Sequence, residues 1–70
     1  MHETIRKLRQ ERGLTQKQVA DYLQVDRSTY AYYESGRTKI PVELMVKLAH
    51  FYKVSYATII GVPEPGLADG

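Results

Sequence analysis

Seventy residues without a cysteine form one small domain at most, and neither disulfides nor thiolate metal sites can hold it together. No apolar run approaches the ~18–20 residues of a membrane span, and the N-terminus lacks the apolar stretch of a signal peptide, so we expect a cytoplasmic protein. The net charge is +2, and two acids, Glu64 and Asp69, lie in the last nine residues, so the remainder is more basic and weakly favours an anionic partner.

Two short helices are predicted in the N-terminal part of the chain. The first spans about residues 2–12 and ends at Gly13, which suits the left-handed conformation of a helix C-terminus. The second opens with Thr15 and Gln18, a capping box in which each side chain accepts a hydrogen bond from a backbone N–H. Apolar residues recur at helical spacing in both helices: Met1, Ile5 and Leu8, then Val19, Ala20 and Leu23.

A third helix is predicted only three residues after the second, beyond the link 24–26. Asp26 is a favourable N-cap, and its carboxylate suits the positive end of a helix over about 27–34 that stops before Gly36. So short a link suits the sharp crossing of a helix-turn-helix unit, with Val25 beneath the turn. Other helical proteins use such turns too, so the link alone leaves DNA binding open.

Two further helices complete a predicted all-α, five-helix domain over residues 1–61. The fourth starts at Pro41, which suits a first helical turn, and the fifth follows an N-cap at Ser55. Residues 62–70 are rich in Gly and Pro and are expected to be a flexible tail. The apolar positions are Val42, Met45, Leu48, Ala49 and Tyr52 in the fourth helix, and Tyr56, Ile59 and Ile60 in the fifth.

The outward face of the third helix suits the DNA major groove. Arg27 can pair bidentately with guanine, Ser28 can hydrogen-bond almost any base, and the Tyr32 ring can pack on a thymine methyl. Thr29 flanks these residues near the helix N-terminus. Each residue alone is explained as well by exposure to solvent, and only the combination with the preceding turn favours base recognition.

The inward face of this helix combines two tyrosines with a charge. At ~100° per residue Tyr30, Tyr33 and Glu34 share one side, which favours a core position over base stacking. Arg9 lies four residues after Ile5, on the apolar side of the first helix. A core-facing charge is costly unless it is paired, so we predict a partly buried Arg9–Glu34 ion pair that fixes the angle of the third helix. The alternative is that both side chains reach water separately.

Phosphate contacts are predicted at both ends of the unit, where they would fix register and give salt-dependent affinity. The second helix begins with Gln16 and the free N–H groups around Lys17, which can receive a phosphate. Tyr22 either lies beside the DNA backbone or packs half-exposed. A basic loop rich in hydroxyls follows the third helix: Ser35, Arg37, Thr38 and Lys39. Solvent exposure is expected for the basic residues of the first helix: Arg6, Lys7 and Arg12.

Several sub-motifs between residues 5 and 60 occur in the order of one known family. They are RGLTQ, the Leu-x-Val turn, STYAYYESGR and KLAHFYKVS. In this the chain resembles the phage repressor/Cro-type (XRE family) helix-turn-helix regulators, whose lambda-repressor-like fold has five helices with the motif in helices two and three. The resemblance implies a DNA-binding transcriptional regulator, usually a repressor, that binds inverted half-sites as a symmetric dimer.

Individual residues also take roles from this resemblance. It implies base contacts from Arg27, Ser28 and Tyr32, with Thr29 as a further candidate. It implies phosphate contacts from Gln16, Ser35, Arg37 and Lys39, and again the Arg9–Glu34 pair. The chain departs from the family at Gln24 and Lys53, which occupy turn positions usually held by glycine. A left-handed conformation there would cost ~1 kcal/mol relative to Gly, and a different turn is the alternative.

The resemblance also bears on partners and on competing functions. Double-stranded DNA and a second copy of the chain are the expected partners. An antitoxin or another protein-interaction module of the same fold is the main alternative to a regulator. An enzyme is disfavoured and no cofactor or metal is expected, because His2 and His50 have no acid at metal-ligand or triad spacing beside them. The candidate dimer surface comprises the last helix and the residues after it: Ile60, Val62 and Leu67.

Overall fold

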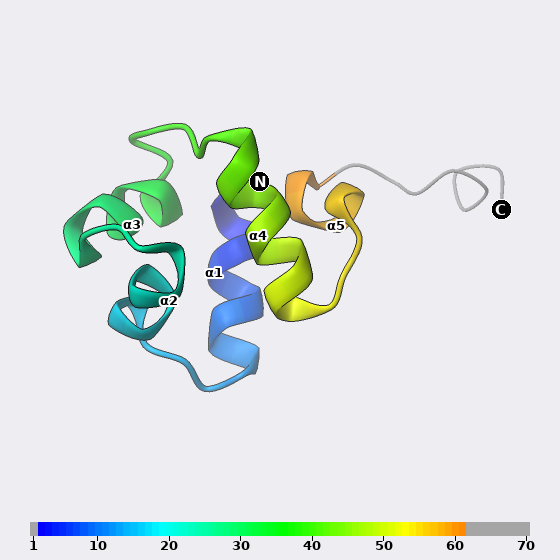
Figure 1. Cartoon of the computed structure of the whole chain (residues 1–70), viewed down its shortest axis with the longest axis horizontal. Helices are drawn as coiled ribbons and strands as arrows, with labels where there is room; N and C mark the ends of the chain where they lie inside the picture. The colour runs from blue at the N-terminus through cyan, green and yellow to red at the C-terminus, as the bar shows by residue number, and fades with distance from the viewer. Residues whose placement is uncertain (1, 62–70) are drawn as a thin grey trace, which may run out of the picture.

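The computed structural model describes residues 2–61, which form five α-helices (Figure 1). They are α1 (His2–Glu11), α2 (Gln16–Leu23), α3 (Arg27–Ser35), α4 (Val42–Tyr52) and α5 (Tyr56–Ile60). The predicted all-α architecture is thereby confirmed. Met1 and the tail predicted over 62–70 lie outside the described residues. Within the described part, no helix has the length and apolar character needed to cross a membrane.

The ends of the helices follow local hydrogen bonding. The capping box that opens α2 is present, with Thr15 Oγ1 accepting from Gln18 N at 3.1 Å and Gln18 Oε1 accepting from Thr15 N at 2.8 Å. Ser55 caps α5 by accepting from Thr58 N. The cap predicted for the Asp26 side chain is wrong, because that carboxylate makes no capping hydrogen bond although its backbone occupies the N-cap position of α3.

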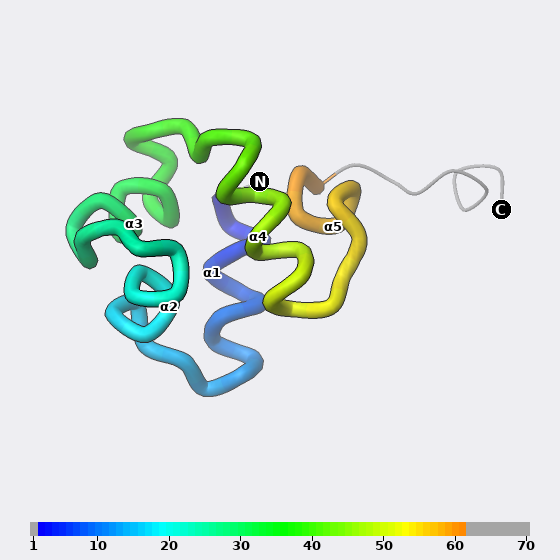
Figure 2. The backbone as a smooth tube through the Cα atoms, in the orientation of Figure 1, coloured from blue at the N-terminus to red at the C-terminus, as the bar shows by residue number. Residues whose placement is uncertain are grey.

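The central helix α1 lies between two pairs of helices, as the ribbon and the tube both show (Figures 1 and 2). On one side α2 crosses α3, and α3 packs against α1. On the other side α4 and α5 pack together, and α5 also contacts α1. This arrangement leaves α3 at the outer edge of the molecule, with only its inner side covered.

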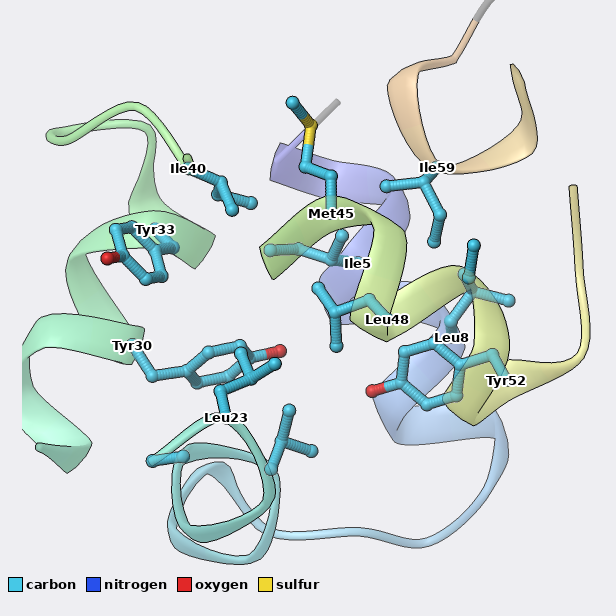
Figure 3. Packing of buried hydrophobic residues seen from close by; sticks show 13 residues of the cluster. Ile5, Leu8, Leu23, Tyr30, Tyr33, Ile40, Met45, Leu48, Tyr52 and Ile59 are labelled. Carbon is cyan, nitrogen blue, oxygen red and sulfur yellow. The ribbon is translucent and has the colours of Figure 1, made fainter. Parts of the chain in front are cut away.

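The buried side chains come from all five helices and converge around α1 and α4 (Figure 3). Tyr30 and Tyr33 lie in this core as predicted, and their rings pack edge to face with centroids 6.4 Å apart. Val42, one of the apolar positions of the fourth predicted helix, is 61% exposed, whereas Met45, Leu48, Ala49 and Tyr52 of the same helix are buried. The buried apolar residues are Ile5, Leu8, Val19, Ala20, Leu23, Tyr30, Tyr33, Ile40, Met45, Leu48, Ala49, Tyr52 and Ile59.

Two turns place a non-glycine residue in the left-handed region. Gln24 ends α2 with φ 61°, and Lys53 ends α4 with φ 57°. Behind each of them the next residue, Val25 or Val54, donates its N–H to a carbonyl in the last turn of the preceding helix. The left-handed conformation is therefore the one adopted at both positions, and the alternative of a different turn is wrong. Each is expected to cost ~1 kcal/mol relative to glycine.

Candidate nucleic-acid interface

The outer face of α3 carries the residues predicted to contact bases. Arg27 and Ser28 are exposed in the first turn, and Tyr32 follows one turn later with 45% of its surface exposed. Thr29 is half-buried at the flank of this face. Because α3 is nine residues long and covered from its inner side, these side chains lie on its outward helix surface.

Behind this surface the predicted ion pair joins α1 to α3. Arg9 Nε donates to Glu34 Oε2 at 2.6 Å and Arg9 Nη2 donates to Oε1 at 3.0 Å, so the contact is two-pronged. The side chains are 13% and 3% exposed, which excludes the alternative that each reaches water separately. The remaining Arg9 nitrogen, Nη1, donates to the Leu14 carbonyl at 2.8 Å and ties the pair to the turn between α1 and α2.

Both charges of the pair are stabilised by their surroundings. Burial alone raises the pKa of Glu34, but hydrogen bonding to Arg9, with help from the nearby Tyr30 hydroxyl and from Gln16, outweighs it and holds that pKa below its ordinary value. The same hydrogen bond raises the pKa of Arg9. The pair is therefore ionised at neutral pH, and the low-dielectric surroundings make its geometry energetically important.

Gln16 extends this buried pair to the outer face. Its Nε2 donates to Glu34 Oε1 at 3.2 Å, and its Oε1 accepts from Arg27 Nη1 at 3.2 Å. A continuous polar chain thus runs from Arg9 in α1 to the first residue of α3. The sequence predicts Gln16 at the start of α2, but only the crossing of α2 over α3 brings it between Glu34 and Arg27.

The loop after α3 is folded back on the helix end. Gly36 adopts φ 81°, which lets the backbone N–H groups of Arg37 and Thr38 both donate to the Tyr32 carbonyl, at 3.1 and 3.4 Å. The Arg37 guanidinium then lies over the Tyr32 ring, 5.6 Å from its centroid. Sequence reasoning had no signal for this contact, since it depends on the path of the loop. Four of the six residues predicted to contact phosphate lie at the end of α3 and in this loop, and all four are exposed: Ser35, Arg37, Thr38 and Lys39.

A model of the helix-turn-helix family matches residues 5–59, from the first turn of α1 into α5. The chain belongs to this family. The resemblance drawn from the sub-motifs is thereby confirmed, and α2 and α3 are its helix-turn-helix unit.

Named relatives agree with this membership. The chain is 40% identical over 63 residues to the cryptic phage CTXphi transcriptional repressor RstR of Vibrio cholerae, covering 90% of this chain and 57% of that protein. It is 35% identical over 66 residues to the uncharacterized HTH-type transcriptional regulator YobD of Bacillus subtilis (strain 168), covering 90% and 59%. A crystal structure of a transcriptional regulator from Listeria innocua superposes with a TM-score of 0.85 at 35% identity, covering 90% and 59%. The chain therefore spans less than two thirds of each of these proteins.

Tyr22 and Lys17, for which the sequence suggests a place near the DNA backbone, also contact other residues of the domain. Tyr22 stacks on Phe51 with centroids 4.3 Å apart, and its hydroxyl donates to the Lys47 carbonyl at 3.4 Å, so the half-exposed packing role is the one the structure supports. Lys17 pairs with Asp21 across one helical turn at 3.2 Å, with both side chains largely exposed.

Arg12 is exposed as predicted, but it also makes contacts that the sequence did not indicate. The residue is exposed, but its Nη2 donates to the Tyr52 carbonyl at 2.9 Å and its guanidinium lies 4.9 Å from the Tyr52 ring centroid. Arg12 thus binds the C-terminal end of α4, where a cation is favoured by the helix dipole. Forty residues separate the two partners, too many for a local pattern to indicate the contact.

Proposed function

We propose that this domain binds double-stranded DNA sequence-specifically, with α3 in the major groove, as part of a transcriptional regulator that acts as a repressor. The observation that carries the proposal is the exposed polar face of α3, backed by a buried ion pair that reaches Arg27 through Gln16. An α-helix fits the major groove, where base edges present distinct donors and acceptors. Two relatives are named as transcriptional regulators, one of them a phage repressor, and this supports the same assignment.

Base recognition falls to the first two turns of α3. Arg27 pairs with guanine O6 and N7, and Gln16 limits the positions that its guanidinium can take. Ser28 hydrogen-bonds a neighbouring base, and Tyr32 packs its ring on a thymine methyl. Thr29 contributes at the flank, since it is half-buried and reaches less far than the others.

Phosphates are held at both ends of the helix-turn-helix unit. The N-terminus of α2 offers free N–H groups around Lys17, together with the part of Gln16 that remains accessible. The end of α3 and the loop after it offer four exposed residues to the opposite side of the groove: Ser35, Arg37, Thr38 and Lys39. These contacts supply salt-dependent affinity, and the bases supply specificity.

Two copies bind an inverted repeat in this proposal. Half-sites about one helical turn apart would place two α3 helices in successive major grooves on one side of the duplex. A closed two-fold dimer matches the symmetry of such a site. Occupation of the site would then block transcription, in line with the repressor named among the relatives.

Selection from a randomised duplex pool, followed by salt titration on the enriched site, tests the proposal. We expect an inverted repeat to be enriched and its affinity to fall steeply with salt. In the same assay Arg27→Ala should weaken binding to the enriched site. Arg6→Ala is its matched control, because it also removes one exposed arginine but lies on α1, outside the helix-turn-helix unit. Failure to enrich any sequence, together with binding that does not respond to salt, would reject the proposal.

A further inference from the structure

The first residue of α1 packs on the turn that follows α3. A Cβ added at Gly36 would lie 3.0 Å from both Nδ1 and Cε1 of His2 and 3.3 Å from its Cγ, so the imidazole ring lies directly against this turn. The other ring nitrogen, Nε2, lies 3.4 Å from Glu3 Oε1, and 43% of the His2 side chain is exposed. Gly36 therefore meets two demands at once, a φ of 81° and the close approach of a ring.

One side of α1 contacts the end of α3 at two places. His2 and Arg9 are seven residues apart, which is about two helical turns, so they share this side of α1. Arg9 holds Glu34 in the last turn of α3, and His2 meets Gly36 just beyond it. The helix end and the turn that follows are thus both held against α1.

This turn sets the positions of residues proposed to hold phosphate. Gly36 lies between Ser35 and Arg37, and the N–H groups of Arg37 and Thr38 both donate to the Tyr32 carbonyl. A side chain that fills the space beside Gly36 therefore restricts how far these exposed residues can move. The imidazole can also carry a charge, and in its protonated form it adds a cation to a loop that already has basic residues.

We propose that His2 is a positioning residue for the loop after α3 and that DNA binding is accompanied by uptake of a proton on its imidazole. The inference rests on the proposed function and adds to it a residue outside the helix-turn-helix unit. The phosphates of a bound duplex bring negative charge to this loop, and negative charge favours the imidazolium over the neutral ring. The charge of histidine changes between pH 5 and 8, so affinity should rise as the pH falls through this range.

The protein's own charges around His2 are present with and without DNA. Glu3 is the nearest, and it favours the imidazolium in both states. Helix α5, which also contacts α1, carries neither a carboxylate nor a basic side chain. The phosphates are therefore what changes the charge around the ring on binding. The other charged groups on the neighbouring elements are Arg6 of α1, the Arg9–Glu34 pair, Arg37 and Lys39 of the loop, and Glu43 at the start of α4.

Fluorescence anisotropy at constant ionic strength tests the proton uptake, with the whole chain and two duplexes, the enriched operator and an unrelated sequence. From pH 8 to pH 6 we expect wild-type affinity to rise by about three- to tenfold for both duplexes, because the phosphates are common to both. His50→Gln is the matched control. It removes the only other histidine, which is exposed on α4, and it should keep the full rise.

Two variants of His2 separate packing from charge. His2→Phe keeps a ring against Gly36 without a titratable group, so its affinity at pH 8 should stay within about twofold of the wild type while the rise toward pH 6 is lost. His2→Ala removes ring and charge, and its affinity at pH 8 should fall by about three- to fivefold because the loop is less preorganised. Circular dichroism and urea unfolding will show that both variants fold. The terminal amino group also titrates near neutral pH, and both variants retain it, so any rise that they keep measures its share.

Several results would overturn the inference and leave DNA recognition standing. They are a wild-type affinity that is the same at pH 8 and pH 6, a His2→Phe variant that keeps the full rise, a His50→Gln variant that loses it, and a His2→Ala variant with wild-type affinity at pH 8. A wild-type chain that binds neither duplex at any pH would instead reject the proposed function, and this inference with it.

Discussion

The two sides of α1 are held by different kinds of interaction. Toward α3 the contact centres on the Arg9–Glu34 pair, whose hydrogen bonds demand one distance and one angle. Toward α5 it consists of apolar side chains such as Ile59, which pack without directional preference. The buried ion pair therefore lies under α3, whereas the opposite side of α1 adds to its apolar contacts one hydrogen bond, from Arg12 to the Tyr52 carbonyl of α4. The apolar side supplies buried surface.

Breaking the ion pair should have the largest effect. Arg9→Met leaves the Glu34 carboxylate buried without its partner, and we expect the free energy of unfolding to fall by about 3–5 kcal/mol. Urea denaturation followed by circular dichroism measures the loss. Replacing both residues, as in Arg9→Met/Glu34→Leu, should cost clearly less because no unpaired charge remains. Equal losses for the single and double variants would contradict the role given to the pair.

Acidification should weaken the α1–α3 contact through Glu34. Its pKa is lower in the folded protein than the ordinary value of 4.5, so its contribution is complete above 4.5 and is lost as the pH falls through the lower folded pKa. Glu34→Gln should therefore be less stable than the wild type by about 2 kcal/mol at pH 7. The difference should shrink in acid. Unfolding free energies measured from pH 7 to pH 3 check this, and a constant difference would contradict it.

Replacing the Gln16 side chain should lower DNA affinity while leaving the stability of the domain nearly unchanged. Gln16→Ala cuts the link between Glu34 and Arg27 but leaves the ion pair in place, so we expect the domain to lose no more than about 1 kcal/mol of stability. Affinity for the selected operator should fall by about 1–2 kcal/mol, because Arg27 loses its support and a phosphate contact is removed. Gln10→Ala, an exposed glutamine on α1, is the control and should change neither quantity.

The smallest effect is expected at the left-handed turns. Gln24→Gly and Lys53→Gly should each raise the free energy of unfolding by up to about 1 kcal/mol, because glycine adopts these positive φ angles without strain. Gly13→Ala makes the opposite change, because it replaces a glycine by a residue with a Cβ at a left-handed position. Gly13 has φ +67° and nothing within 4 Å of an added Cβ, so any loss reports backbone strain alone. A gain in stability for Gly13→Ala would contradict this interpretation.

Features encoded locally could be predicted from the sequence. The capping box, the two faces of α3 and the opposite charges of Arg9 and Glu34 depend on helical periodicity and on the cost of burying a lone charge. They required no knowledge of how distant helices cross. The family sub-motifs then added the order of the helices, which the structure has.

Features set by the crossing of helices could not be predicted. Gln16 meets Glu34 only because α2 lies across α3, and Arg12 reaches Tyr52 only because α1 ends beside the end of α4. The exposure of Val42 likewise depends on which side of α4 the other helices cover. Asp26 occupies the N-cap position of α3 as its residue type favours, but its carboxylate makes no capping hydrogen bond.

The central claim, that the outer face of α3 recognises DNA sequence, is tested most directly by the base preferences of Arg27→Ala. We expect this variant to lose about 1–3 kcal/mol of operator affinity and its preference at one base pair of each half-site. Lys39→Ala, in the basic loop, should instead weaken all sequences alike and reduce the salt dependence. If Arg27→Ala kept the wild-type preference at every position and weakened all sequences equally, α3 would not be the element that recognises bases.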